Sequence, residues 1–193
     1  MKNLVGLFIL GLIFGTPAMA QDVPQFEIGG GVAYRSFDQF SGSRINMGGW
    51  EAYGDYHIWR FINVAGDIAG TYNRYSSSSS VNKTNTSTDI YSFLVGPQLY
   101  PFGHRHKITA YAHVLFGGGD YRYHITQVGF TPFSTSDFGQ VWMAGGGLDW
   151  KIKEHWSVRV IQADYEQSRF VSGAASQTNY RASIGLVYRF REK

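Results

Sequence analysis

The chain of 193 residues contains no cysteine, so no disulfide frame holds it together and its stability must come from burial and strand pairing. Charged residues are scarce at 16%, where about a quarter is usual in a soluble domain. The formal net charge of +3 is too small to indicate a nucleic-acid partner. After residue 20 no apolar run approaches the roughly 20 residues of a membrane-spanning helix, so any residence in a membrane must be as a barrel.

Residues 1–20 have the layout of a secretory signal peptide. Lys2 gives the charged region, residues 4–14 the apolar region, and Ala18-Met19-Ala20 the small-residue cleavage region. The apolar region is too short to span a bilayer as a helix. We therefore expect cleavage after Ala20 and one exported domain, an outer-membrane β-barrel of residues 21–193.

Apolar and polar residues alternate along most of the remaining chain, which is the period of a strand with two different faces. The pattern predicts eight strands, at about residues 26–37, 45–57, 62–73, 89–100, 108–118, 138–150, 156–168 and 180–190. The connections alternate between short turns at 58–61, 101–107 and 151–155 and longer loops at 38–44, 74–88, 119–137 and 169–179. Short periplasmic turns and longer extracellular loops indicate an all-β fold, an eight-stranded antiparallel up-and-down transmembrane β-barrel.

The placement of lysine and aromatic residues decides which face of the strands is outside. A soluble lipocalin-like barrel would show the same alternation inverted. Every lysine after residue 20 falls in a predicted turn, loop or tail, whereas lysine is common on the wall of a soluble barrel. Aromatic residues, Tyr100 among them, gather near strand ends, as interfacial girdles do. The main predicted girdle residues are Trp50, Trp59, Trp142, Trp150, Trp156, Tyr188 and Phe190.

The opposite face of the strands carries charges of both signs. The predicted interior charge network consists of Glu27, Arg35, Glu51, Asp55, Asp67, Asp149, Arg159, Asp164, Arg181 and Arg189. Eight strands enclose an interior just wide enough for side chains to fill. These residues therefore favour a closed, polar, salt-bridged interior, with a narrow channel as the alternative.

The seventh strand breaks the alternation. If Arg159 points inward, strict alternation sends Gln162 and Asp164 to lipid, at a cost of about 1–3 kcal/mol for the carboxylate near mid-membrane. A β-bulge around Val160 to Gln162 would turn both inward, and we expect that bulge. We also expect Arg159 to pair with at least one carboxylate, the candidates being Glu27, Asp149 and Asp164.

Two segments carry a family resemblance. Residues 180–190 read Tyr-Arg-Ala-Ser-Ile-Gly-Leu-Val-Tyr-Arg-Phe, and residues 157–165 read Ser-Val-Arg-Val-Ile-Gln-Ala-Asp-Tyr. With the eight-strand plan, the chain resembles the transmembrane domain of the outer-membrane protein A superfamily, particularly short outer-membrane β-barrel proteins of environmental bacteria. The resemblance implies that the barrel-assembly machinery recognises the C-terminal strand through Phe190. Only three residues follow Phe190, so we expect no peptidoglycan-binding domain and no wall-tethering role.

Candidate chemistry is sparse. His124 and Thr126, with nearby Asp120, supply a base, a hydroxyl and a carboxylate, the groups that lipid A deacylases and palmitoyltransferases use. They lie in the predicted loop 119–137 rather than on the lipid-facing wall, so we expect no enzyme activity, with a lipid A-modifying enzyme as the alternative. The histidines of residues 104–106 have no cysteine or carboxylate partner in sequence. We predict no catalytic residue, no metal and no cofactor.

The two longest predicted loops offer surfaces for binding. Residues 75–89 are rich in Ser, Thr and Asn, and residues 120–137 include Phe130, Pro132 and Phe133, which would either form an adhesive patch or pack against the barrel mouth. The predicted function is a structural or surface-interaction role for a monomer in the outer membrane of a Gram-negative-type bacterium. Its expected partners are outer-membrane lipid and lipopolysaccharide, with no nucleic acid.

Overall fold

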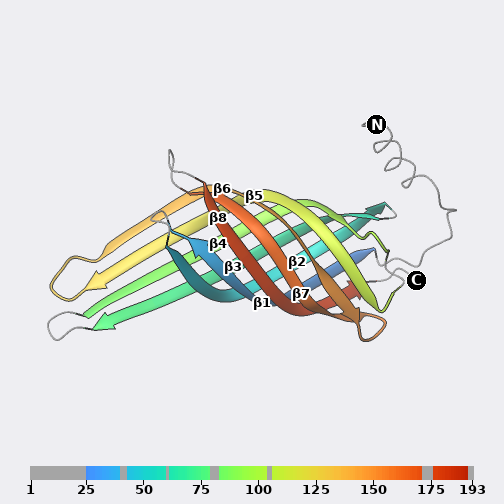
Figure 1. Ribbon diagram of the computed structural model, residues 1–193, viewed down its shortest axis with the longest axis horizontal. Helices are drawn as coiled ribbons and strands as arrows, with labels where there is room; N and C mark the ends of the chain where they lie inside the picture. The colour runs from blue at the N-terminus through green and yellow to red at the C-terminus, as the bar shows by residue number, and fades with distance from the viewer. Residues whose placement is uncertain are drawn as a thin grey trace, which may run out of the picture.

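The computed structural model describes residues 25–39, 43–59, 61–78, 83–103, 106–170 and 176–190. They form a closed barrel of eight antiparallel strands in which each strand pairs with its sequence neighbours and β1 pairs with β8 (Figure 1), which confirms the predicted fold. Within these ranges no helix is long and apolar enough to cross a membrane. The strands are β1 Phe26–Asp38, β2 Arg44–Trp59, β3 Ile62–Ser78, β4 Lys83–Leu99, β5 Ile108–Gln127, β6 Phe133–Lys151, β7 Trp156–Arg169 and β8 Gln177–Phe190. The predicted signal peptide lies outside the described residues.

The barrel closes through the pairing of its first and last strands, which runs from Phe26 opposite Phe190 to Ser36 opposite Tyr180. Two glycines, Gly31 and Gly185, face each other in this seam. A Cβ atom on Gly185 would lie 2.6 Å from the carbonyl oxygen of Gly30, closer than real side chains approach a backbone oxygen. The absence of a side chain here lets β1 and β8 come close enough to pair.

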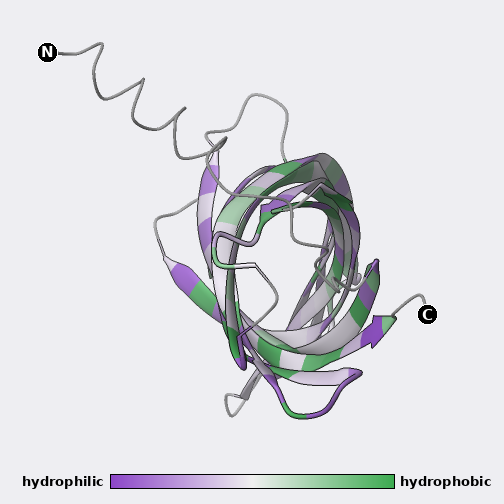
Figure 2. Cartoon of the chain, turned by 90° about the vertical axis from the view of Figure 1, so that its right-hand side faces the viewer, coloured by the Kyte–Doolittle hydropathy of each residue, from purple (hydrophilic) through white to green (hydrophobic). Residues whose placement is uncertain are grey.

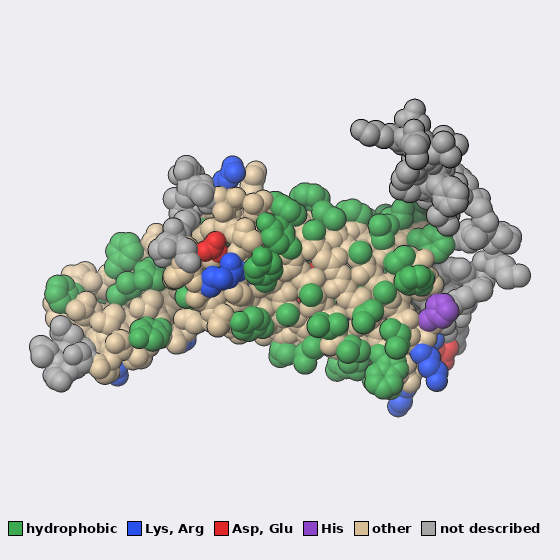
Figure 3. All heavy atoms as spheres, in the orientation of Figure 1, with side chains coloured by type: hydrophobic (Ala, Val, Ile, Leu, Met, Phe, Trp, Pro, Cys, Tyr) green, Lys and Arg blue, Asp and Glu red, His purple; other side chains and the backbone are tan. Residues whose placement is uncertain are grey.

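The wall of the barrel has an apolar outer face and a filled interior. Large apolar side chains such as Val32, Phe116 and Ile184 are exposed on the outside, while their sequence neighbours point into the lumen. Figure 2 shows the strands enclosing the lumen, with hydrophobic and hydrophilic bands alternating along them. On the face seen in Figure 3, hydrophobic side chains cover the barrel wall and the charged side chains lie toward its two ends.

Four strands extend well past the rest of the barrel at one end (Figure 1). β3 and β4 stay paired out to Ser78 opposite Lys83, and β5 and β6 out to Ile125 opposite Phe133, while β4 and β5 pair out to Thr84 opposite Gln127. We call residues 74–78, 83–88, 120–127 and 133–138 the projecting sheet. The predicted loops 74–88 and 119–137 are therefore wrong, because most of their residues continue the strands.

The predicted bulge in β7 is confirmed. On one side Leu148 pairs with Ile161 and Asp149 with Arg159, which leaves Val160 as the extra residue. In the pairing of β7 with β8 the register also shifts, between Arg159 and Gln162. The extra residue puts Gln162 and every second residue after it inside the barrel, in phase with Arg159.

Candidate functional site

All the residues predicted to form the interior charge network are buried in the lumen, each no more than 4% exposed. Arg181 on β8 is the most connected of them. Its Nη1 and Nη2 donate to Asp67 Oδ1 and Oδ2 on β3, at 2.7 and 2.8 Å, and its Nε donates to Asp164 Oδ2 at 3.2 Å. Glu51 lies slightly farther away, with Oε2 3.9 Å from Nη2. A single guanidinium group thus ties β8 to β2, β3 and β7.

Arg159 is the second crossing point of the lumen. It points inward from β7 and pairs with Asp149, its Nε 2.9 Å from Oδ1, so the predicted pairing with a carboxylate is confirmed. Its guanidinium carbon lies 3.7 Å from the ring centre of Tyr53 on β2 and 4.4 Å from that of Tyr111 on β5. A cation held between two rings from opposite parts of the wall fills the lumen and is stabilised by the faces of both rings.

Two further arginines complete the network. Arg35 Nη2 on β1 reaches across to Ser92 Oγ on β4 at 3.1 Å and to Glu166 Oε2 on β7 at 3.0 Å. Arg189 Nε lies 2.9 Å from Glu27 Oε1 on the neighbouring strand. Contacts of both kinds, between neighbours and across the lumen, hold the wall from inside.

Two members of this network, Glu166 and His113, were not predicted from the sequence. Glu166 is buried against Arg35, and His113 Nε2 lies 2.9 Å from Asp164 Oδ1. Glu166 was within reach of sequence reasoning, because the bulge that turns Asp164 inward also turns the residue two positions later. The described lumen then holds seven buried carboxylates against four guanidinium groups.

Asp55 is one of the carboxylates with no arginine in hydrogen-bonding contact, and neutral groups hold it. Asn63 Nδ2 donates to its Oδ1, while Gln98 Nε2 and the Tyr100 hydroxyl lie 3.4 Å from its Oδ2. Tyr100 is fully buried in this contact. Its predicted place in an aromatic girdle is therefore wrong, because its hydroxyl satisfies a lumen carboxylate instead of facing the interface.

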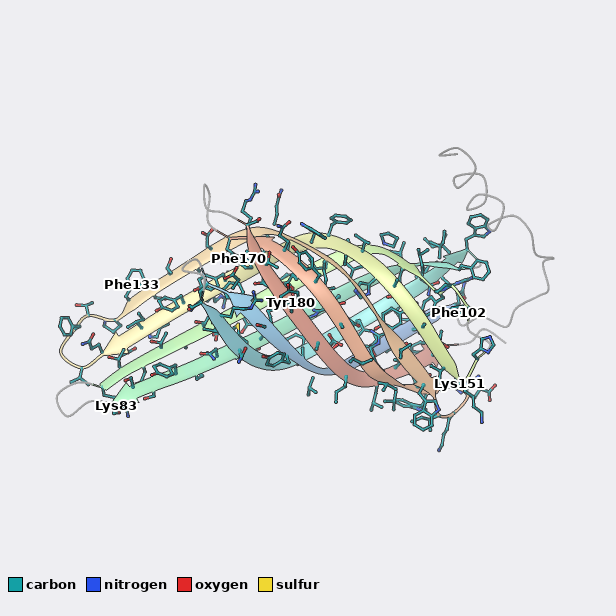
Figure 4. All side chains as sticks on the ribbon, in the orientation of Figure 1. Lys83, Phe102, Phe133, Lys151, Phe170 and Tyr180 are labelled. Atoms are coloured by element: carbon teal, nitrogen blue, oxygen red, sulfur yellow. The ribbon has the colours of Figure 1, made fainter. Side chains whose placement is uncertain are left out.

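The interior is not polar throughout, which differs from the prediction. An apolar cluster occupies the lumen toward the projecting sheet, made up of Phe37, Met47, Ala65, Ile90, Leu94, Leu115, Val141, Met143 and Phe170. Tyr121 packs on it from β5, its ring 5.7 Å from Phe37 and 5.8 Å from Phe170. Figure 4 shows Phe170 at the level where the projecting sheet leaves the barrel. The barrel mouth is therefore lined by packed rings and aliphatic side chains.

Aromatic side chains of the predicted girdles lie on the outside near both ends of the wall. Trp50, Trp59, Trp150, Trp156 and Phe190 are exposed. The remaining two are partly covered: Trp142 donates from Nε1 to Gln167 at 2.8 Å, and Tyr188 packs between Trp156 and Phe190, with ring centres 5.0 and 4.7 Å away. Trp50 Nε1 also donates to the Tyr72 hydroxyl at 3.0 Å. Such rings combine an apolar body with a polar edge, which suits a membrane interface.

The outer face at the base of the projecting sheet carries two ion pairs. Arg74 on β3 pairs with Asp89 on β4, and this hydrogen bond raises the pKa of Arg74. Arg122 on β5 pairs with Asp120, with 2.6 Å between Nη2 and Oδ2, and its guanidinium lies 5.3 Å from the Tyr91 ring centre. Each positive charge is therefore matched by a neighbouring carboxylate.

The far part of the projecting sheet exposes apolar side chains. Val128 and Phe130, in the turn between β5 and β6, are 64% and 66% exposed, and Phe133, at the start of β6, is 58% exposed. Figure 4 places Phe133 and Lys83 toward the tip, at the opposite end of the molecule from Phe102 and Lys151. These side chains lie well beyond the apolar wall of the barrel.

The candidate catalytic residues lie on β5, not in a loop. Thr126 Oγ1 is 3.0 Å from His124 Nε2, but Asp120 is engaged by Arg122. His124 therefore has a hydroxyl neighbour, while the carboxylate of Asp120 pairs with Arg122 instead. Among the residues described here, no group of three or more His, Cys, Asp or Glu side chains could hold a metal ion; His104 lies outside them.

Comparison with known proteins agrees with the fold. The family model described as the outer membrane protein beta-barrel domain matches residues 6–190. No curated protein matches the sequence. Among solved structures, Ail, the attachment invasion locus protein of Yersinia pestis, is 19% identical with a TM-score of 0.65, covering 87% of this chain and 99% of that one. That structure is a complex with the heparin analogue sucrose octasulfate.

Two other solved barrels are similar. Neisserial surface protein A is 14% identical with a TM-score of 0.58, covering 86% of this chain and 97% of that one. OprG from Pseudomonas aeruginosa is 15% identical with a TM-score of 0.50, covering 89% and 98%. Together with the family match over nearly the whole chain, these likenesses agree on one architecture. The chain therefore belongs to the outer-membrane β-barrel domain family and resides in the outer membrane of a Gram-negative bacterium.

Proposed function

We propose that this protein is a non-enzymatic surface-attachment protein in which a closed barrel is the anchor and the projecting sheet is the binding element. The observation that carries the proposal is the sheet itself, four paired strands that continue past the barrel mouth. In six residues a strand advances about 20 Å, so the tip stands clear of the lipid headgroups. The similarity to a protein named for attachment supports the same role.

Exposed apolar residues at the tip supply the binding energy. Val128, Phe130 and Phe133 are exposed outside the lipid-facing wall, where they gain nothing from the membrane. Soluble surfaces seldom present such side chains together unless they bind something. Partner binding that covers them is worth about 25 cal/mol for each Å² of apolar surface removed from water.

In this proposal the filled lumen stiffens the barrel and does not let ions through. Arg35, Arg159 and Arg181 each contact residues from non-neighbouring strands, so the lumen is crossed at three places. Ions would have to break these pairs or pass the apolar cluster at the mouth. A rigid, filled barrel holds the base of the projecting sheet in a fixed orientation.

Outer-membrane lipid is the second proposed partner. The girdle rings would lie at the two interfaces, and the base of the projecting sheet would meet lipopolysaccharide headgroups. Arg74 and Arg122 lie over the rings of Tyr72 and Tyr91, with 5.9 and 5.3 Å between guanidinium carbon and ring centre. Matched by Asp89 and Asp120, they offer directed hydrogen bonds without a net positive field.

The proposal is tested by removing the projecting sheet without disturbing the barrel. Arg74 lies opposite Ser87, and Arg122 opposite Ser136, so each hairpin can be closed in register at these pairs by a two-residue Asn-Gly turn. Bacteria that display the wild type should attach to alkyl-coated glass more than bacteria that display the shortened barrel. Uncoated glass and a strain without the protein serve as controls.

Heat-modifiable gel mobility and surface labelling must show that the shortened barrel is folded and present at the wild-type level. If such cells attach as well as the wild type, the projecting sheet is not the binding element and the proposed function is wrong.

A further inference from the structure

One side of the projecting sheet ends in a strand without a neighbour. β6 pairs with β7 only from Gln140 opposite Arg169 toward the periplasmic end, whereas its pairing with β5 continues to Phe133. Within the described part of the chain, residues 133–138 therefore pair on one side only. Figure 1 shows this strand as the free margin of the projecting sheet. Some of its backbone N–H and C=O groups point away from β5 and are available to another strand.

The free edge of β6 has few of the features that usually keep an edge from pairing. Residues 133–138 read Phe-Ser-Thr-Ser-Asp-Phe, with no lysine and no proline, and the β5–β6 register has no shift. The other edge differs. On β3, Arg74 is tied to Asp89, and the Asn73 side chain donates to the Asn46 carbonyl at 2.8 Å. The β6 edge is therefore open to strand addition.

We propose that this edge pairs antiparallel with the same edge of a second copy of the chain, about a two-fold axis at Ser136. Such an axis is perpendicular to the sheet, so each pair must join residues whose side chains point to the same face. Residues 133, 135 and 137 continue the lumen-facing row of Gly139 and Val141, while 134, 136 and 138 continue the outer row. Only axes centred on a residue satisfy this condition.

Charge and hydrogen bonding select the residue on the axis. Centred on Ser136, the pairing places Thr135 opposite Asp137 of the second copy, twice, so each carboxylate faces a hydroxyl donor. Centred on Thr135, it would place Asp137 opposite Phe133 twice, which leaves both carboxylates against apolar rings. Neither arrangement puts like charges opposite each other, but the first one satisfies the only charged residue of the edge.

This pairing joins copies in facing membranes. Two barrels in one membrane point the same way, so their β6 strands run parallel and cannot pair antiparallel. The two-fold axis perpendicular to the sheet inverts one barrel relative to the other. The inference thus deepens the proposed attachment function, on which it rests, by naming the partner as the same protein on another cell. A six-residue edge is small, so each contact is weak and many contacts between two cells add together.

The absence of cysteine makes a direct test possible. On the two-fold axis the two copies of residue 136 face each other with Cα atoms about 4.5–5.5 Å apart, within disulfide range. In detergent micelles under mild oxidation, Ser136→Cys should form a disulfide dimer. Ser76→Cys, at an exposed position on the other edge strand, should not. Equal cross-linking of the two variants, or none of Ser136→Cys, overturns the inference.

Charge reversal on cells gives the second test. Bacteria that display Ser136→Lys or Ser136→Glu should each clump less than the wild type, because like charges meet on the axis. The loss should be about fivefold per contact and greater over many contacts. Mixing the two strains should restore clumping in alternating pairs, and added salt should weaken the mixed clumps more than wild-type clumps. The Ser76→Lys and Ser76→Glu strains serve as matched controls.

A mixture that stays dispersed, or equal effects at Ser76, contradicts the pairing. Attachment to alkyl-coated glass separates the two proposals. If the shortened barrel loses that attachment while both Ser136 variants keep it and clump like the wild type, self-pairing is wrong and the attachment function stands.

Discussion

At the scale of single residues, the sequence predicted most of the charges that lie inside, but it offered pairing candidates for Arg159 alone. Alternation alone placed Arg159 and Arg181 in the lumen, because a charge on the lipid face is costly. It could not assign Arg181 to Asp67 on β3, since that contact depends on how the four intervening strands, β4 to β7, curve around the lumen. Tyr100 was misplaced for the same reason: its hydroxyl reaches Asp55 only in the closed barrel.

The first prediction concerns Arg159. Arg159→Ala leaves Asp149 buried without its guanidinium partner, and loss of one partner of a buried pair costs about 3–5 kcal/mol. Val158→Ala removes only lipid contact from the adjacent outward residue and should cost far less. Urea unfolding of the refolded barrels, followed by tryptophan fluorescence, gives both values.

The double variant Arg159→Ala with Asp149→Ala should recover part of the lost stability, because no unpaired charge remains. A double variant no more stable than Arg159→Ala would mean that the pair itself is not what Arg159 contributes.

At the scale of strands, the sequence located all eight but ended several of them too early. Residues 74–78 and 133–138 are mostly Ser, Thr or isolated aromatic residues, a composition typical of loops. They form strands because each is paired to a neighbour that is already in register at the barrel wall. Pairing that propagates from a formed hairpin outweighs weak local preference. The bulge in β7 was predictable, because strict alternation would have sent Asp164 to lipid.

The second prediction concerns that bulge. Deletion of Val160 removes the extra residue and forces either Arg159 or the set from Gln162 to Glu166 onto the lipid face. We expect this deletion to abolish the heat-shifted, folded band on a gel, whereas Val160→Ala should retain it. A folded deletion variant would show that β7 tolerates polar or charged side chains on its lipid face.

The third prediction concerns the closing seam. Gly185→Ala puts a Cβ atom against the Gly30 carbonyl oxygen and should destabilise the barrel by about 1–3 kcal/mol. Gly48→Ala is the matched control, because a Cβ atom there meets nothing within 4 Å. Equal urea midpoints for the two variants would mean that the β1–β8 seam is more open than the structure has it.

At the scale of the whole molecule, the barrel divides into a filled anchor and a projecting sheet. The sequence predicted the anchor well, because membrane and lumen impose opposite demands on alternate residues. It did not predict the sheet, because above the membrane both faces meet water and alternation carries less information. The apolar cluster inside the mouth was missed for a related reason: Ile90, Leu94 and Leu115 occupy inward positions that were expected to be polar.

The fourth prediction is that the filled barrel does not conduct ions. In planar bilayers the wild type should give no large, stable openings, because three arginines cross the lumen and an apolar cluster closes the mouth. Arg181→Ala removes the arginine with the most contacts across the lumen. Any conductance should therefore be greater in this variant than in the wild type, which makes it the comparison for the measurement. Stable wild-type openings of porin size would contradict the proposal that the filled lumen does not let ions through.

Amide hydrogen exchange in residues 74–78, 83–88, 120–127 and 133–138 of the barrel refolded in micelles tests the account most directly, since both proposals depend on the projecting sheet. If these residues form the sheet, amides of β4 and β5 within it should be protected along their length. Those of residues 133–138 should alternate between protected and fast, because only every second one bonds to β5. Fast exchange throughout all four segments would show that they are loops after all, and would contradict the account.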